Sequence, residues 1–285
     1  MRTPTVLLCA LLCGACATVR MEDRALLQPV RDNPRAVSAL DSTLRASGAE
    51  PHRIRAPDGA ELFAVVLRHP RATATVLYFG GNGFRISQAG RHAAGILLPL
   101  GVNVVLVDHR GYGRSTGTPT TISQLQADAV AAYDYVAALP GIDRARIVVH
   151  GQSLGSFMAG EVADRRPVGG LVLESSATTA ADWRRYVSPR PWYARPFVRV
   201  RVSESMRRAG NLERVRRIRA PLLVLVGERD SVTPPPLSRR LYQQSATPDS
   251  LKRLHVLAGA GHNDVPAHPD FARVYTEFLR LVAGR

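Results

Sequence analysis

The stretch VVHGQSLGSF, residues 148–157, decides the fold, because it places a serine between two glycines after an apolar run and before small, helix-compatible residues. Its centre, Gly151-Gln152-Ser153-Leu154-Gly155, has the spacing G-x-S-x-G. That spacing is typical of a sharp strand-to-helix turn that exposes one hydroxyl, and glycine is needed where strand and helix crowd together. A plain Gly/Ser turn would look the same, so the stretch predicts a nucleophile only if the chain also supplies its partners.

A carboxylate and a histidine occur at the positions where such a serine needs them. A serine hydroxyl becomes a good nucleophile when a histidine, itself held by a carboxylate, removes its proton. Asp230 follows an expected strand at 222–228, and His262 lies in the loop after the next expected strand at 251–257. The order Ser–Asp–His along the chain is the one expected when a G-x-S-x-G turn connects a strand and a helix of an α/β fold. We therefore predict a catalytic triad of Ser153, Asp230 and His262.

Other acidic and histidine side chains nearby are weaker candidates. Glu228 is expected within or at the end of its strand, so Asp230 is better placed to reach outward. Asp264 remains a backup carboxylate, although a role in loop structure is the stronger interpretation. Three more histidines are in positions that suit structural roles. His150 is expected to pack beside the turn, His255 lies inside an expected strand, and His268 stands at the start of a helix.

A second glycine-rich stretch, YFGGNGF at 78–84, follows an expected strand and opens towards a helix. The tetrahedral intermediate of acyl transfer carries a negative oxygen, which preorganised amide donors stabilise. One donor comes from the residue after the nucleophile and one from an earlier loop. We therefore predict that the backbone amides of Leu154 and Asn82 form an oxyanion hole. A simple glycine-rich turn is the alternative interpretation.

Short apolar runs alternate with helical stretches after Pro51, which predicts an α/β fold: a mainly parallel sheet with helices on both faces. The sheet is expected to begin with an antiparallel hairpin that turns at Asp58-Gly59. Thr121 with Gln124 suggests a capping box at the start of one helix. Ligands of such sheets gather beyond the carboxyl ends of the strands. The expected buried strands are 74–79, 102–108, 147–150, 171–174, 222–228 and 251–257.

One interval breaks this alternation. The stretch between the expected strands that end at residue 174 and begin at residue 222 is far longer than a crossover requires. We predict a small lid insertion at about 177–215, over the carboxyl edge of the sheet. Its aromatic residues suggest an apolar acyl group and its arginines an anionic group or a membrane face, but packing of the lid on its own domain explains them equally well. The aromatic residues are Trp183, Tyr186, Trp192, Tyr193 and Phe197.

Length and charge limit the function classes. The chain has 285 residues, 45% of them hydrophobic, which suits one large α/β domain at 51–285 or at most two small ones. The net charge is +15, yet Lys252 is the only lysine among 38 basic residues. Because lysine is an effective phosphate partner too, this composition does not favour a nucleic-acid partner. The basic excess does favour contact with anionic surfaces such as membranes.

The first residues predict export. A basic residue, a short apolar stretch and small residues indicate a signal peptide at 1–15 that is too short to span a bilayer. The letters LCGAC resemble a bacterial lipoprotein signal, so we predict lipidation of Cys16 and attachment to the periplasmic face of a membrane, the outer membrane being favoured. A plain signal peptide, with a periplasmic or secreted product, is the alternative. Residues 16–50 are expected to form a tether with one or two short helices.

The cysteine positions bear on cofactors. All three cysteines lie in the first 16 residues, at positions 9, 13 and 16. Cleavage before Cys16 would leave no other thiol for disulfides, metal binding or nucleophilic catalysis. Metal-ligand spacing is also lacking in the sequence, so we expect neither a metal nor an organic cofactor.

Four motifs together resemble those of the α/β-hydrolase superfamily over residues 51–285. The motifs are GQSLGS, GERDSVTPP, GAGHNDVP and VDHRGYGRSTG. They are similar to those of a serine hydrolase branch with acyl-protein thioesterase-like and depalmitoylase-like members and related bacterial esterases. By position, the resemblance implies that Ser153, Asp230 and His262 are the triad.

The loop at 78–84 departs from that pattern at Gly80, where such proteins commonly have histidine. The resemblance therefore implies a different support for the loop, while the backbone donor at Asn82 should remain. Residues 108–110, Asp-His-Arg, match a recurring stretch of these proteins and are expected to brace the loop.

Together these features predict an exported serine hydrolase that cleaves a carboxylic ester or thioester. His262 would take the proton of Ser153, an acyl-enzyme would form, and water would release the acid. The expected partner is a small-molecule or acylated substrate, and the sequence does not define an oligomeric state. A serine peptidase on the same fold is the enzymatic alternative, and a non-catalytic lipid-anchored binding protein is the alternative from another class.

Overall fold

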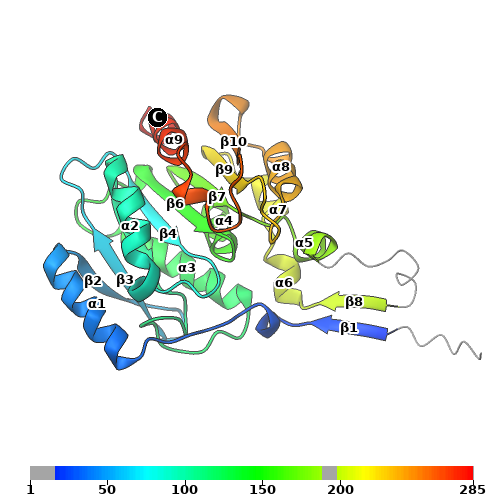
Figure 1. Cartoon of the computed structure of the whole chain (residues 1–285), viewed down its shortest axis with the longest axis horizontal. Helices are drawn as coiled ribbons and strands as arrows, with labels where there is room; N and C mark the ends of the chain where they lie inside the picture. The colour runs from blue at the N-terminus through cyan, green and yellow to red at the C-terminus, as the bar shows by residue number, and fades with distance from the viewer. Residues whose placement is uncertain (1–16, 188–197, 285) are drawn as a thin grey trace, which may run out of the picture.

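An eight-stranded sheet forms the centre of the computed structural model, which describes residues 17–187 and 198–284 (Figure 1). The strand order is β10-β9-β7-β6-β4-β5-β3-β2. Only the β2–β3 and β3–β5 pairings of this sheet are antiparallel, so the mainly parallel α/β sheet predicted from the sequence is confirmed. The strands are β2 Glu50–Arg55, β3 Glu61–Leu67, β4 Thr75–Phe79, β5 Asn103–Val107, β6 Ile147–Gln152, β7 Gly170–Glu174, β9 Leu222–Gly227 and β10 Lys252–Leu257.

The first two strands of this sheet form the hairpin expected at Asp58-Gly59. Ala56 and Ala60 close the turn through a 2.7 Å hydrogen bond from the amide of Ala56 to the carbonyl of Ala60. Gly59 has a φ of 88°, which glycine adopts without steric cost. The hairpin therefore forms the antiparallel edge of the sheet.

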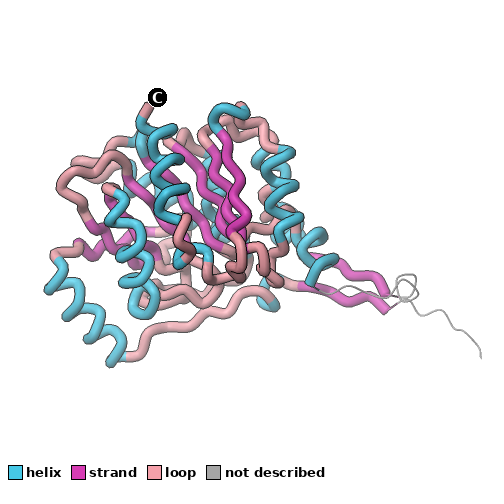
Figure 2. The backbone as a smooth tube through the Cα atoms, turned by 45° about the horizontal axis from the view of Figure 1, so that its top comes forward, coloured by secondary structure: helices cyan, strands magenta, loops and turns pink. Residues whose placement is uncertain are grey.

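Helices cover both faces of the sheet, and each face has its own core (Figure 2). On one face, α3 (Ile122–Ala137) and α4 (Gly155–Arg165) contribute most of the buried helical side chains. On the other, α1 (Pro34–Ser47), α2 (Arg91–Leu97) and α9 (Phe271–Ala283) do so. Central strands such as β6 contribute alternate residues to the two cores, which is why they consist of uninterrupted apolar runs.

The capping box expected at α3 is only half formed. The side chain of Thr121 accepts a 3.1 Å hydrogen bond from the amide of Gln124, as an N-cap should. The carboxamide of Gln124, however, accepts from Thr120 and donates to Asp58 instead of returning to the amide of Thr121. The start of α3 is therefore capped by the side chain of Thr121 alone.

The segment before the hairpin is tied to the domain by more than one contact. It contains α1, a 3-10 turn at Asp23–Ala25 and a strand that the sequence did not predict, β1 (Ala17–Met21). β1 pairs in parallel with β8 (Val198–Val202), forming a separate two-stranded sheet that extends from the body of the molecule (Figure 1). Buried Asp23 accepts a 2.7 Å hydrogen bond from the amide of Ile122 and so also anchors the start of α3.

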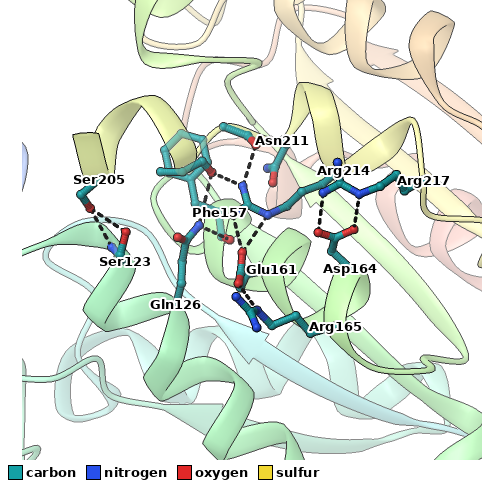
Figure 3. A network of polar contacts seen from close by, with 12 residues as sticks. Ser123, Gln126, Phe157, Glu161, Asp164, Arg165, Ser205, Asn211, Arg214 and Arg217 are labelled. Carbon is teal, nitrogen blue, oxygen red and sulfur yellow. Dashed lines mark hydrogen bonds and ion pairs between the residues drawn. The ribbon is translucent and has the colours of Figure 1, made fainter. Parts of the chain in front are cut away.

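The interval predicted as a lid contains helices that dock on α3 and α4 (Figure 3). Buried Arg214 donates to Glu161 of α4 at 2.9 Å, while Asn211 donates to the carbonyl of Ser156 at 3.0 Å. Gln126 of α3 donates to the carbonyl of Ala209. These contacts fix the insertion beside the start of α4. Its elements are α5 (Ala180–Val187), β8, α6 (Glu204–Arg208) and α7 (Leu212–Val215).

Candidate active site

Ser153 occupies a strained turn between β6 and α4. Its φ is 52°, a left-handed conformation that non-glycine residues rarely adopt, and its amide donates to the carbonyl of Glu174 at 2.9 Å. The packing excludes larger residues beside it: a Cβ on Gly155 would lie 2.0 Å from the carbonyl oxygen of Phe79. The strand, the turn and the helix thus have the arrangement that the G-x-S-x-G spacing predicts.

The structure brings Ser153, His262 and Asp230 together although they lie far apart in the chain. His262 Nε2 is 3.0 Å from Ser153 Oγ. His262 Nδ1 is 2.9 Å from Oδ2 and 3.0 Å from Oδ1 of Asp230. An ionised carboxylate can only accept, so Nδ1 donates to Asp230 and Nε2 is left to accept the serine proton. This is the geometry of a nucleophile, a base and a carboxylate that orients the base.

The surroundings of Asp230 keep its carboxylate ionised. Burial raises its pKa, but the hydrogen bond from His262 and the donors of Thr233 outweigh burial and hold the pKa below the ordinary 3.8. The amides of Val232 and Thr233 donate to Oδ1 at 2.9 and 2.7 Å, and the Thr233 hydroxyl lies 2.8 Å from Oδ2. The role of Thr233 was not predicted from the sequence, although its position three residues after Asp230 is that of a residue closing the same turn.

The loop of His262 is held from outside the triad. Ser175, whose φ is 47°, donates through its hydroxyl to the carbonyl of His262 at 3.2 Å. The two rival carboxylates have loop contacts of their own: Asp264 accepts from the amide of Gly261, and Glu228 accepts from the amide of Gly259. Neither of these contacts involves His262, so the geometry favours Asp230 as the partner of the imidazole.

The loop at 78–84 lies directly against the turn of Ser153. A Cβ on Gly81 would lie 3.3 Å from the Cβ of Ser153, so the backbone of this loop approaches Ser153 closely. Asn82 and Leu154, the predicted sources of the oxyanion donors, both line the cavity that contains Ser153. The side chain of Asn82 donates to the carbonyl of Leu26 at 2.6 Å and accepts from Tyr112 at 2.7 Å. These bonds hold the side chain of Asn82, and with it the loop, in place.

The loop at 78–84 is supported although it has glycine at position 80, where proteins with similar motifs commonly have histidine. A Cβ on Gly80 would lie 2.1 Å from the ring of Phe84, which leaves no room for a side chain. His109 Nε2 lies 2.8 Å from the carbonyl of Gly80 instead. Asp108 accepts from the amide of Ile86 at 2.8 Å, at the far end of the same loop.

An apolar cavity of about 160 Å³ opens beside Ser153 on the α3 and α4 face of the sheet. Phe157 of α4 and Met206 of α6 line it, so the insertion contributes one of its walls. Trp183 of α5 also lines it and donates through its indole to the carbonyl of Val232 at 2.8 Å. Tyr186, in contrast, is 46% exposed. The other aromatic residues predicted in the lid, Trp192, Tyr193 and Phe197, lie outside the described residues.

Three further observations apply only to the described part of the chain. Residues 17–187 and 198–284 contain no cluster of three or more histidine, cysteine or acidic side chains that could hold a metal ion. No helix in those ranges has the length and apolar character needed to cross a membrane. Cys16, the predicted lipidation site, lies outside them.

Comparison with solved structures agrees with this fold. The chain is similar to the esterase Pf2001 of Pyrococcus furiosus, with a TM-score of 0.68, 19% identity, and coverage of 89% of this chain and 98% of that one. It is also similar to proline iminopeptidase of Mycobacterium smegmatis, with a TM-score of 0.60, 20% identity, and coverage of 82% and 99%. The fold is therefore that of the α/β-hydrolases, as the sequence motifs implied.

Family and sequence comparisons narrow the class. The chain belongs to the prolyl oligopeptidase family, whose model matches residues 91–281, and this places it among hydrolases of the α/β-hydrolase kind. It is 38% identical over 189 residues to an uncharacterized protein of Mycobacterium tuberculosis, and this match spans 66% of the chain but 63% of the relative. It is 27% identical over 212 residues to protein bem46 of Schizosaccharomyces pombe, over 74% of the chain and 68% of the relative.

Proposed function

We propose that the protein is a serine hydrolase that cleaves a carboxylic ester or thioester. The observation that carries the proposal is the chain of contacts from Ser153 Oγ through His262 to Asp230, at 3.0 and 2.9 Å. His262 removes the proton as Ser153 attacks the carbonyl carbon, and Asp230 stabilises the imidazolium that results. The amides of Leu154 and Asn82 receive the negative oxygen, and His262 then returns the proton to the leaving group. Water, activated by the same histidine, releases the acid.

The apolar cavity supports an acyl compound as the substrate. It adjoins the nucleophile and is lined mainly by apolar side chains, among them Phe157, Trp183 and Met206. An apolar group placed there leaves water and gains about 25 cal/mol for each Å² that is buried. A hydrocarbon acyl chain of limited length suits such a cavity.

Covalent labelling with a fluorophosphonate tests whether Ser153 is an activated nucleophile. We expect the wild-type protein to be labelled and Ser153→Ala to remain unlabelled, because the reagent traps the serine that a neighbouring base has activated. Ser156→Ala is the matched control, since its hydroxyl donates to the carbonyl of Ser153. Folded wild-type protein that never labels would favour the non-catalytic binding protein instead.

A serine peptidase is the second candidate, and the family match is the observation that favours it. A panel of esters and thioesters of increasing chain length, assayed beside the corresponding amides and aminoacyl amides, separates the two candidates. The ester assignment predicts turnover of the acyl esters or thioesters. Turnover of amides alone would favour the peptidase.

We also propose that the protein is exported and anchored to a membrane through Cys16, which the lipoprotein-like letters LCGAC support. Expression in a bacterium supplied with a labelled fatty acid tests this. We expect label in the membrane fraction for the wild type and its loss in Cys16→Ser. Cys13→Ser is the control that keeps the label. A wild-type protein that is exported without the label would support a plain signal peptide.

A further inference from the structure

A second cavity, of about 300 Å³, lies on the opposite face of the sheet from the apolar cavity, towards α2 and α9. It adjoins the catalytic residues on both sides: Gln152 precedes the nucleophile, Asn263 follows the histidine, and both line it. Asn82 lines this cavity and the apolar one alike. Ser153 itself lines the apolar cavity and the residue before it lines the second one, an arrangement that suits a substrate with two dissimilar halves.

The inner wall of this second cavity contains a buried carboxylate. Glu174, at the end of β7, lines it and is 0% exposed. Its Oε2 is 3.0 Å from Nε2 of His150, which is itself 1% exposed and lies 3.3 Å, at Nδ1, from the hydroxyl of Tyr275. Its Oε1 has no hydrogen-bond partner among the described residues. We call this cavity the Glu174 cavity.

An unpartnered carboxylate oxygen in such a place is costly to the folded protein. A buried acceptor without a donor loses its hydration with nothing to replace it, and the loss is greater when the group is charged. Arginine balances other buried carboxylates of this chain, as in the pair of Glu161 and Arg214. No arginine or lysine is among the described residues that line the Glu174 cavity. His150 is bonded through Nε2 to the other oxygen, Oε2, so Oε1 is left for a donor that a bound group can supply.

The rest of the lining suits an organic cation. The rings of Tyr78, Phe84 and Phe271 line the cavity, and Tyr78 packs edge-on against His150 with 5.0 Å between ring centroids. Aromatic faces attract ammonium groups, and the attraction grows when the cation leaves water. A carboxylate behind aromatic walls thus provides both a charge partner and a π surface for a small ammonium group.

We propose that the Glu174 cavity binds the ammonium group of a substrate whose other half is apolar, so that the preferred substrates are amine-bearing esters or thioesters. The ammonium N–H donates to Oε1 of Glu174, while the apolar half occupies the cavity beside Phe157 and Trp183. The substrate class rests on the proposed function, whereas the binding of the cation does not.

Two probes of matched shape test the cation site without any turnover. 2-(Dimethylamino)ethanol is cationic at pH 7, and 3-methylbutanol replaces its nitrogen by carbon. A ligand that binds only the folded state raises the melting temperature. In the Ser153→Ala protein, which cannot hydrolyse, we expect the amine to raise the melting temperature and the alcohol to leave it unchanged. In Glu174→Gln the shift by the amine should disappear. Glu277→Gln removes an exposed carboxylate of α9 and should keep it.

The melting temperature without ligand separates a binding role of Glu174 from a merely structural one. A structural role predicts that Glu174→Gln lowers this temperature. Glu174→Gln keeps the shape of the side chain and an oxygen for His150 but removes the buried charge. Because burying a charge with an unpaired oxygen is costly, we expect its melting temperature without ligand to equal or exceed that of the wild type. A clear loss of stability, a shift by the amine that survives in Glu174→Gln, or an equal shift by the alcohol would each overturn the proposal.

A second pair of compounds tests the substrate class. 2-(Dimethylamino)ethyl butanoate and 3-methylbutyl butanoate differ only in the cationic nitrogen. A hydrogen bond to a charged group contributes about 1.5–3 kcal/mol, so we expect kcat/KM to favour the amine ester about tenfold to a hundredfold. Glu174→Gln should remove the preference. Binding of the amine without turnover of any ester would overturn the proposed hydrolase and keep the cation site, whereas turnover of both esters at equal rates would overturn the amine-bearing substrate class.

Discussion

At the scale of single residues, the candidate site depends on conformations and contacts that few other side chains could provide. Ser153 and Ser175 are the two described non-glycine residues with positive φ. Ser153 is the candidate nucleophile, and Ser175 donates to the carbonyl of His262. Strain of this kind costs on the order of 1–3 kcal/mol for each residue and persists where the surrounding structure imposes it. Both strained residues directly follow neighbouring strands, β6 and β7, at the edge where ligands of such sheets bind.

Asp230→Asn should lower kcat by about 10⁴ while leaving the fold intact. An asparagine amide facing Nδ1 of His262 donates, so the imidazole turns to the tautomer whose Nε2 carries the proton and cannot accept from Ser153. Steady-state hydrolysis of the best ester of the panel measures the loss. Asp264→Asn is the control, since Asp264 accepts from the amide of Gly261. Activity of Asp230→Asn within tenfold of the wild type would contradict this role for Asp230.

At the scale of helices and strands, local patterns predicted most of the sheet. The expected strands at 74–79 and 171–174 match β4 and β7 to within one residue, because uninterrupted apolar runs define buried parallel strands. β1 and β8 were missed, since a two-stranded sheet built from segments about 180 residues apart leaves no local periodicity to detect.

The candidate site shows the same limit. The letters of GQSLGS and GAGHNDVP were enough to select Ser153 and His262, because each motif lies on one short loop. The supports of those residues come from distant parts of the chain: Ser175 contacts His262, and the segment around Leu26 contacts Asn82. Glu174 was read as the last residue of a strand, and only the packing of α9 against β6 and β7 places it in a cavity.

Arg214→Met tests how the insertion is attached. Arg214 and Glu161 are 6% and 8% exposed, and the guanidinium also donates to the carbonyls of Ala209 and Gly210 at 2.6 Å each (Figure 3). Removing one partner of a buried pair typically costs about 3–5 kcal/mol. Because Arg165 still contacts Glu161, we expect the lower end of this range in the free energy of unfolding, measured with urea.

Arg217→Met is the matched control for that change. Arg217 pairs with Asp164 on the same helix, α4, but its side chain is 59% exposed, so its loss should cost at most about 1 kcal/mol. Arg214→Met should also disturb the wall of the apolar cavity, because Met206 and Ala209 of the insertion line it. Equal effects of the two substitutions on stability would contradict the importance given to the buried pair.

At the scale of the whole molecule, the segment before the hairpin and the loops at the carboxyl edge support one another. Gln28 donates through its amide to the hydroxyl of Tyr112 at 2.9 Å, and Arg31 forms a bridge with Gly113. Asp32 accepts from Ser87 at 2.6 Å and lies close enough to Asp108 to affect its ionisation. A segment expected to be a tether therefore packs against the loop that carries Asn82. Removal of this segment would take away the hydrogen bonds by which Leu26 and Gln28 hold Asn82, one of the two candidate oxyanion donors.

Asp108 lies at the centre of these contacts and should make the stability of the whole protein depend on pH. Burial raises its pKa to about 7 from the ordinary 3.8, and the nearby Asp32 carboxylate adds to the rise, although the amides of Arg114 and Ile86 oppose it. Between these pH values the folded protein holds a proton that the unfolded chain releases. The free energy of unfolding therefore decreases as pH rises from about 4 to about 7, by up to about 4 kcal/mol from this group.

Asp108→Asn should remove most of that slope, because an asparagine cannot ionise. The amides of Ile86 and Arg114 donate to different oxygens of Asp108, so the one oxygen of asparagine still accepts from one of them. Urea unfolding at steps of half a pH unit between pH 4 and pH 7 measures the slope in both proteins. A loss of stability from the missing acceptor is the same at every pH, so it does not affect the comparison of slopes. Asp58, whose pKa is lowered to about 2 chiefly by its hydrogen bond with Arg110, acts in the opposite direction at lower pH. If the slope of the free energy of unfolding against pH is unchanged in Asp108→Asn, other groups govern the pH dependence. The proton that the folded state retains near neutral pH would then not reside on Asp108.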